Sequence, residues 1–415
     1  MMTNNKYSLA KIASYITGGS MAICANLSPI LFITFKDLYN ISYTLLGFIV
    51  VINFLTQLVI DLAFSFFTKY FNIHKCVRMT PLIVFIGLLL YGIMPMLFPK
   101  MAYLWIIIST IIFSVASGLS EVLLSPVIAE IPSENPEHEM SKLHSMYAWG
   151  VVVVVLISTL YLNIFGTENW MYLAFLWALV PFSAFLLFLK AELPQMSNTD
   201  KKSTNNKFLS KGMLLCMLCI FLGGAAECTM AQWSSSFLER AIGDHKVFGD
   251  VFGVAFFAML LGLARTFYSK YGKNIINFML MGMIGATFCY IIAGVVLNPV
   301  ICIIACALTG LFTAMLWPGT LIYLEENFTN VSVSAYALMA AGGDMGAAIV
   351  PQLVGVVSDK FALSEIALKF SGFFNISSEQ FGMRCGIITA AIFPLLGTIV
   401  ILYMKKYFKN KKTQG

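Results

Sequence analysis

Charged residues are scarce in this chain. Asp, Glu, Lys and Arg make up 11% of its 415 residues, whereas hydrophobic residues make up 59%. Soluble domains carry about 25% charged residues, so a soluble enzyme, a disordered chain and a coiled coil are excluded. The alternating ten-residue segments of a porin-type barrel are missing as well.

The motifs of several chemistries are also missing. No Gly-x-x-x-x-Gly-Lys-Ser/Thr run is present, which argues against an ATP-driven pump. The four histidines are not spaced as metal ligands, and no serine nucleophile elbow occurs. The nine cysteines are an odd number scattered through apolar segments, so they imply no disulfide framework. We therefore expect no metal site, no cofactor and no enzymatic activity.

Apolar blocks of about twenty residues dominate the chain, and each is long enough to cross the hydrocarbon core of a bilayer as a helix. The sequence predicts an all-α integral membrane protein with 12 transmembrane helices, at about 8–34, 43–66, 79–97, 102–129, 141–163, 169–189, 211–237, 248–269, 275–297, 300–324, 332–357 and 382–404.

The longest polar connection divides these spans into two sets of six. Residues 190–210 have the composition of a flexible linker, which predicts two six-helix bundles over 1–189 and 211–415. With both termini in the cytoplasm, 19 of the 26 Lys and Arg residues fall in inside segments. This bias favours that orientation in a cell (plasma or inner) membrane and leaves no basic face for nucleic acid.

The two sets of six spans carry internal repeats. Ser117–Pro126 and Thr309–Pro318 share glycine and proline at a constant offset of 192, and Ser145–Ala148 matches Ser334–Ala337 at an offset of 189. Spans one and seven each contain a Gly-Gly pair. Three matches in the same order, half a chain apart, indicate two parallel repeats, as in transporters.

Twelve spans, a central loop and a parallel repeat resemble the major facilitator superfamily over the whole chain. The bacterial fucose–galactose–glucose:proton symporters are similar at four segments: Ser117–Pro126, Leu143–Gly150, Glu227–Trp233, and Gly342–Gly346 with Pro351, Gly355 and Asp359. The resemblance implies alternating access between two parallel six-helix bundles. It also implies that an acid at the position of Glu121 takes part in proton coupling.

Two departures from this family pattern stand out. The signature loop between spans two and three, Phe67–Lys75, lacks its acid and has Asn72 near the expected glycine. Because asparagine tolerates a left-handed turn, the turn is expected to survive there. The sugar–proton branch is associated with a carboxylate in span one. This span has no acid here, and Asn26 is the candidate polar group among its central residues.

Three carboxylates lie well inside spans, where a charge is costly and indicates function. Glu121 is the first candidate for exchanging a proton and binding a solute; the alternative is a carboxyl capped by Ser117 or Ser120. Glu227, with Gln232 and Trp233, forms a set suited to a sugar, and the alternative is a hydrogen bond between packed helices. Asp344 follows Gly342 and Gly343, which would admit a neighbouring helix, so it too has either role.

Other candidates have weaker patterns. Tyr147 is deep enough in span five to reach solute, and Trp317 joins the candidate solute contacts. Asp61 is expected to serve gating or structure, and Arg265 to extend toward the inside surface. Pro126 and Pro318 should free backbone carbonyls, which serves either helix bending for alternating access or simple packing. The acidic run Glu130, Glu134, Glu137 and Glu139 is expected to be a solvated loop.

We interpret the chain as a secondary transporter in the lipid bilayer, acting as a monomer on a small solute and a coupling cation, with the proton preferred. Symport of a sugar is the favoured reaction. Proton-coupled efflux of lipophilic cations is the alternative, because 23 Met and 35 Phe could line an adaptable pocket. A non-transporting membrane sensor is a third, weaker reading.

Overall fold

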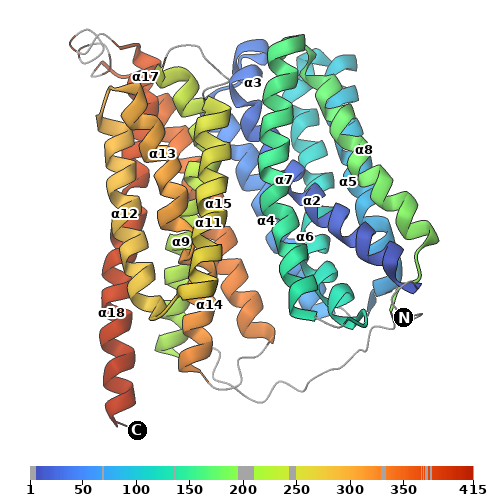
Figure 1. Ribbon diagram of the computed structural model, residues 1–415. Coiled ribbons are helices and arrows are strands. Elements are labelled where there is room, and N and C mark those ends of the chain that lie inside the picture. The colour runs from blue at the N-terminus through green and yellow to red at the C-terminus, as the bar shows by residue number, and fades with distance from the viewer. Residues whose placement is uncertain are drawn as a thin grey trace. The chain divides into compact units, whose positions relative to one another are not determined.

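The computed structural model describes residues 6–67, 70–133, 136–194, 210–242, 249–328, 333–365, 367, 369, 373 and 376–414, which are helical apart from short turns (Figure 1). Residues 195–209 of the predicted linker lie outside this range. The first half contains α2 (Ser8–Ile30), α3 (Phe32–Tyr39), α4 (Tyr43–Phe67), α5 (Ile73–Leu97), α6 (Ala102–Glu130), α7 (Pro136–Phe165) and α8 (Trp170–Lys190). The second contains α9 (Lys211–Ile242), a π-helical stretch (Gly249–Ala255), α11 (Phe256–Tyr271), α12 (Ile275–Val295), α13 (Pro299–Thr313), α14 (Leu316–Asn327), α15 (Val333–Ala362), α17 (Ser378–Ala390) and α18 (Ile392–Gln414).

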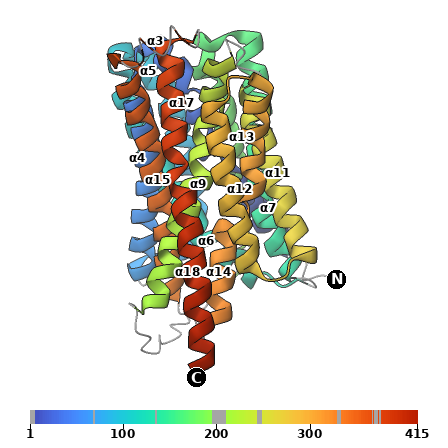
Figure 2. The same ribbon diagram turned by 90° about the vertical axis from the view of Figure 1, so that its left-hand side faces the viewer.

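Eleven helical segments among the described residues are long and apolar enough to cross a membrane. The pair α2 and α3, bent by 45° at Leu31, adds a twelfth when it is counted as one span. The predicted all-α integral membrane fold is therefore confirmed, although span boundaries move by several residues. The last span shows this most clearly, because α17 continues into α18 and on toward the C-terminus (Figure 2).

The chain forms two compact units, one of Met1–Ile41 with Ile52–Lys201 and the other of Ser42–Val51 with Lys202–Gly415. The division at Lys201 falls inside the polar segment 190–210. Helix α4 belongs to both units, because its first turns pack with the second unit and the rest with the first. Nothing in the sequence distinguishes these first turns from the remainder of span two.

The internal repeat has a structural counterpart at two glycines related by the offset of 192. A Cβ on Gly118 of α6 would lie 3.1 Å from the backbone oxygen of Gln57 in α4. A Cβ on Gly310 of α13 would lie 2.2 Å from the backbone oxygen of Phe257 in α11. In each unit the glycine thus lets the fourth span of the repeat approach the second.

Two local expectations from the sequence are wrong. Asn72 has a φ of −79° rather than a left-handed conformation, because its side chain caps α5 by accepting a hydrogen bond from the Lys75 N–H. Within the acidic run, Glu139 lies in helix α7 rather than in a solvated loop. It accepts hydrogen bonds from Lys11 Nζ at 2.8 Å and from the Tyr15 hydroxyl. Glu134 and the side chain of Glu137 lie outside the described residues.

These contacts predict a pH-dependent contribution of Glu139 to stability. Hydrogen bonds from Lys11 and Tyr15 hold the pKa of this carboxyl below its usual range, so it stabilises the fold above the unfolded-state pKa. The contribution is lost as the pH falls through the folded-state pKa. Glu139→Gln should lower the melting temperature at neutral pH and have no effect at low pH. The expected loss in the free energy of unfolding is about 1 kcal/mol or less, because the pair is partly exposed. Glu168→Gln, which removes an exposed carboxyl, is the control; an equal loss at both pH values would contradict the assignment.

Candidate functional site

The first polar cluster lies inside the first unit, between α4 and α6. The Ser114 hydroxyl donates to Asn53 Oδ1 at 2.6 Å, and the Ser117 hydroxyl donates to Gln57 Oε1 at 3.1 Å. One turn further along α4, Asp61 is only 9% exposed, and its Oδ1 has no hydrogen-bond partner among the described residues. A Cβ on Gly118 would lie 3.1 Å from this atom.

Glu121 follows Gly118 by one turn of α6, and its side chain is exposed. The Ser117 hydroxyl donates to Gln57 and the Ser120 hydroxyl to the Ala116 carbonyl. A hydroxyl has one proton to donate, so neither serine caps the Glu121 carboxyl as the structural alternative proposed. Glu121 lies instead within electrostatic reach of Asp61.

The second cluster lies inside the second unit and centres on Arg265 of α11. The Arg265 Nη2 donates to Glu227 Oε1 at 3.0 Å and to Oε2 at 3.2 Å. Its Nε donates to the Ala314 carbonyl at 2.9 Å. Pro318 has no N–H for the carbonyl four residues earlier, so the proline frees the oxygen that Arg265 occupies. The expectation that Arg265 extends toward the inside surface is wrong, because a carboxylate and a free carbonyl are available nearer.

Asp344 belongs to the same region as Glu227. Both acids, together with Arg265, lie within electrostatic reach of Cys228, and Asp344 is buried. A Cβ on Gly343 would lie 2.4 Å from the Trp317 ring, and one on Gly342 would lie 3.3 Å from Ile220. These two glycines therefore serve helix packing, and Trp317 lies half-buried against Gly343.

Several candidates from the sequence lie in packed surroundings. Trp233 is 0% exposed and donates its indole N–H to the Pro351 carbonyl at 2.9 Å, so its ring is not available to stack on a sugar. Gln232 is buried beside it. Asn26 is buried and donates to the Ala22 carbonyl of its own helix at 2.9 Å. Tyr147 by contrast is exposed.

The two candidate proline bends differ. The α6 helix continues through Pro126, whereas a break at Ala314 and Met315 separates α13 from α14 just before Pro318. Among the described residues, no group of three or more His, Cys, Asp or Glu side chains is placed to hold a metal ion.

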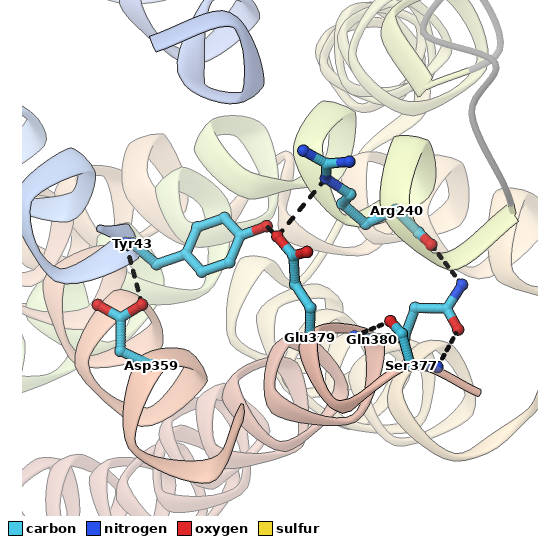
Figure 3. A network of polar contacts seen from close by, with 6 residues as sticks. All are labelled: Tyr43, Arg240, Asp359, Ser377, Glu379 and Gln380. Atoms are coloured by element: carbon cyan, nitrogen blue, oxygen red, sulfur yellow. Dashed lines mark hydrogen bonds and ion pairs between the residues drawn. The ribbon is translucent and has the colours of Figure 1, made fainter. Parts of the chain in front are cut away.

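A third cluster surrounds the start of α4, within the second unit (Figure 3). Asp359 near the end of α15 accepts hydrogen bonds from the backbone N–H groups of Tyr43 at 3.1 Å and Thr44 at 2.6 Å. The Tyr43 hydroxyl donates to Glu379 of α17, whose carboxylate lies 3.6 Å from Arg240 Nε at the end of α9. Gln380 donates to the Arg240 carbonyl at 2.6 Å.

Sequence reasoning missed this third cluster. The sequence singled out Asp359 only as part of a segment that resembles the symporter branch. Its partner Tyr43 lies 316 residues away in the chain. Free N–H groups at a helix start do predict an acceptor, and α4 has no acid in its own first turn. Ser42 caps only the Leu45 N–H, so the unmet N–H groups of Tyr43 and Thr44 are the signal that could have directed attention to a distant carboxylate.

Comparison with known proteins identifies the fold. A family model described as the Major Facilitator Superfamily matches residues 13–351. No curated protein matches the chain.

Solved structures resemble the chain over nearly its whole length. A bacterial homologue of the human lysosomal transporter Spinster, inward-facing and occupied, has a TM-score of 0.76 at 12% identity, covering 97% of each chain. The nucleoside transporter NupG has a TM-score of 0.70 at 13% identity, covering 97% of this chain and 100% of its own. A D-xylose-proton symporter has a TM-score of 0.69 at 16% identity, covering 93% and 96%. At these identities the likeness shows the fold alone.

The Glu227–Arg265 pair predicts non-additive mutational effects. Glu227→Gln leaves the guanidinium with one carbonyl partner, and Arg265→Gln leaves an uncompensated carboxylate, so each should lower the melting temperature. The double variant should lose less than the sum, with a coupling of about 1–2 kcal/mol because Arg265 is partly exposed. Thermal unfolding of the four proteins in detergent measures this coupling. Lys270→Gln, an exposed change on the same helix, is the control, and additive losses would exclude the pair.

Asp359 predicts a second effect at the start of α4. Because its carboxylate accepts two backbone N–H bonds, Asp359→Ala should remove about 1–2 kcal/mol of helix-end stabilisation. Amide hydrogen exchange at Tyr43 and Thr44 should accelerate accordingly, while exchange at the capped start of α5 stays unchanged. Asp37→Asn, which changes an exposed acid elsewhere, is the control. Unchanged exchange at Tyr43 and Thr44 would show that Asp359 does not stabilise the start of α4.

Proposed function

Because the chain belongs to the major facilitator superfamily, we propose that this transporter is a secondary active symporter coupling entry of a small polar solute to a proton. The observation that carries the proposal is Glu121, an exposed carboxyl inside a membrane-spanning helix whose neighbouring hydroxyls are engaged elsewhere. A carboxyl inside a span that has neither a capping hydroxyl nor a counter-cation among the described residues is suited to binding and releasing a cation.

The proton is the proposed coupling ion because it neutralises a carboxylate at little geometric cost. A single charge that moves inward with the solute contributes about 2.3 kcal/mol per 100 mV of membrane potential, which is about a 50-fold concentration ratio. Alternating access would expose the site first to one side and then to the other, through two six-helix bundles over 1–189 and 211–415. Both termini are proposed to be cytoplasmic in a plasma or inner membrane, and the protein to act as a monomer.

A sugar is the proposed solute. The resemblance to the fucose–galactose–glucose branch supports it, as do fold neighbours that by name transport D-xylose and a nucleoside. Because Trp233 is buried, Trp317 replaces it as the proposed aromatic contact. Its ring packs against Gly224, one turn before Glu227. A half-buried indole next to charged hydrogen-bonding groups fits the apolar face and the hydroxyls of a sugar ring.

Efflux of lipophilic cations remains the second candidate, and one observation favours it. The described residues provide no ion pair to Glu121 or Asp61, and unpaired carboxylates attract cations. A non-transporting sensor has no comparable support in the structure.

A thermal-shift screen of purified protein tests these candidates. Monosaccharides, nucleosides, amino acids and lipophilic cations are each offered at two pH values to wild type, Glu121→Gln and the control Glu168→Gln. A ligand that binds the folded state raises the melting temperature. We expect one sugar to stabilise wild type and the control in a pH-dependent way, and Glu121→Gln without pH dependence. Stabilisation by lipophilic cations alone would overturn sugar symport in favour of efflux.

A further inference from the structure

We propose that Asp61 and Glu121 form one proton-binding site, in which a single proton is shared between a buried carboxyl on α4 and an accessible carboxyl on α6. This inference rests on the proposed function and deepens it. It gives Asp61, which the sequence assigned to gating or structure, a direct part in cation binding.

The first step is the register of the two helices. Asn53, Gln57 and Asp61 are spaced four apart, which places them on one face of α4. Two of these residues already have partners on α6. Asn53 pairs with Ser114 at a separation of 61 residues, and Gln57 pairs with Ser117 at a separation of 60. The same separation carries Asp61 to Glu121.

The second step is the kind of bond in this series. In both existing pairs an O–H group of α6 donates to a side-chain oxygen of α4. At the third position of the series, Asp61 and Glu121, the acceptor is present. Asp61 Oδ1 is a buried oxygen without a hydrogen-bond partner among the described residues. An ionised Glu121 has no proton to donate, but a protonated Glu121 supplies the same O–H group that Ser114 and Ser117 supply.

The third step is the charge around the pair. Glu121 is the charged residue that interacts with Asp61 among the described residues. On the helices that pack against α6, the basic side chains that the structure describes are engaged elsewhere or exposed. Lys11 of α2 pairs with Glu139, Arg78 of α5 donates to the Ala191 carbonyl, and Lys142 of α7 lies over the Tyr15 ring. On α5, His74 bonds the Pro194 carbonyl, and Lys75 is exposed.

Two neighbouring carboxylates without a cation do not both stay ionised, and one proton held between them relieves the repulsion. The proton comes from water and returns to water; no covalent bond to carbon changes. Glu121 is the exposed member and exchanges it, while Asp61 accepts the hydrogen bond from the buried side.

The second repeat shows that helix packing does not require these acids. Gly310 brings α13 against α11 as Gly118 brings α6 against α4. Asp61 lies four residues after Gln57, so its equivalent is Leu261, four residues after Phe257. The equivalent of Glu121, three residues after Gly118, is Thr313, whose hydroxyl donates to the Thr309 carbonyl in its own helix. The same contact thus forms with an apolar residue and a self-satisfied hydroxyl, which leaves the carboxyl pair to serve a function other than packing.

The test is infrared spectroscopy of the full-length protein in detergent, which detects protonated carboxyls by their C=O stretching band and its shift in deuterium oxide. Wild type, Asp61→Asn, Glu121→Gln and the double variant are compared at neutral pH, with Asp37→Asn as a control for an exposed acid. Monodispersity and melting temperature are measured on each variant to exclude misfolded protein.

A shared proton predicts that either single variant removes the same one-carboxyl band, since the remaining acid ionises beside an amide. The double variant then removes no more than a single one, and Asp37→Asn removes nothing. Separate losses that add in the double variant would show two independent acids and overturn the pair. An unchanged band in either single variant would overturn it as well.

This readout does not depend on transport. A shared band in a protein that shows no proton-driven uptake would leave the pair standing and overturn proton symport. Proton-driven uptake with independent bands would support proton symport and overturn the shared carboxyl pair.

Discussion

Gly118 lets two membrane-spanning helices of the first unit come within contact distance, and the polar chemistry of that unit depends on this approach. A side chain at this position would meet the backbone of Gln57 and the carboxylate of Asp61. The close contact places the polar stripe of α4 against the serines of α6. Asn53 and Gln57 of this stripe accept hydrogen bonds from serine hydroxyls. The third residue, Asp61, is proposed to share a proton with Glu121, in a setting where an isolated charge is costly.

The two units treat their membrane carboxylates differently. In the second unit Glu227 has a permanent counter-charge in Arg265, which a freed carbonyl at the α13–α14 break also holds. In the first unit the described residues offer Asp61 and Glu121 no such cation. A permanently paired acid is suited to orienting neutral polar groups, whereas an acid pair without a counter-charge is suited to taking up a mobile cation. The first unit is therefore proposed to bind the coupling ion, and the Glu227–Arg265 region to contact solute.

Features set by local composition could be predicted from the sequence, and those set by pairing between distant residues could not. Apolar length alone located the spans, and the offset of 192 located Gly118 and Gly310. Pro318 predicted a free carbonyl, but no local pattern identified Arg265, 49 residues away, as its donor. The spacing of Asn53, Gln57 and Asp61 was a readable polar stripe that was missed. The sequence predicts a sugar contact for Trp233 because an indole ring suits the apolar face of a sugar. Only the packed structure shows that its N–H donates to the Pro351 carbonyl.

The most direct measurement is solute accumulation in proteoliposomes under an imposed pH gradient, alkaline inside, with and without a proton ionophore. The account predicts that a sugar accumulates above its external concentration only while the proton gradient lasts, and that the ionophore returns it to equilibrium. Accumulation that persists after the proton gradient has collapsed, or that follows another cation gradient, would contradict proton coupling through the carboxyls of the first unit.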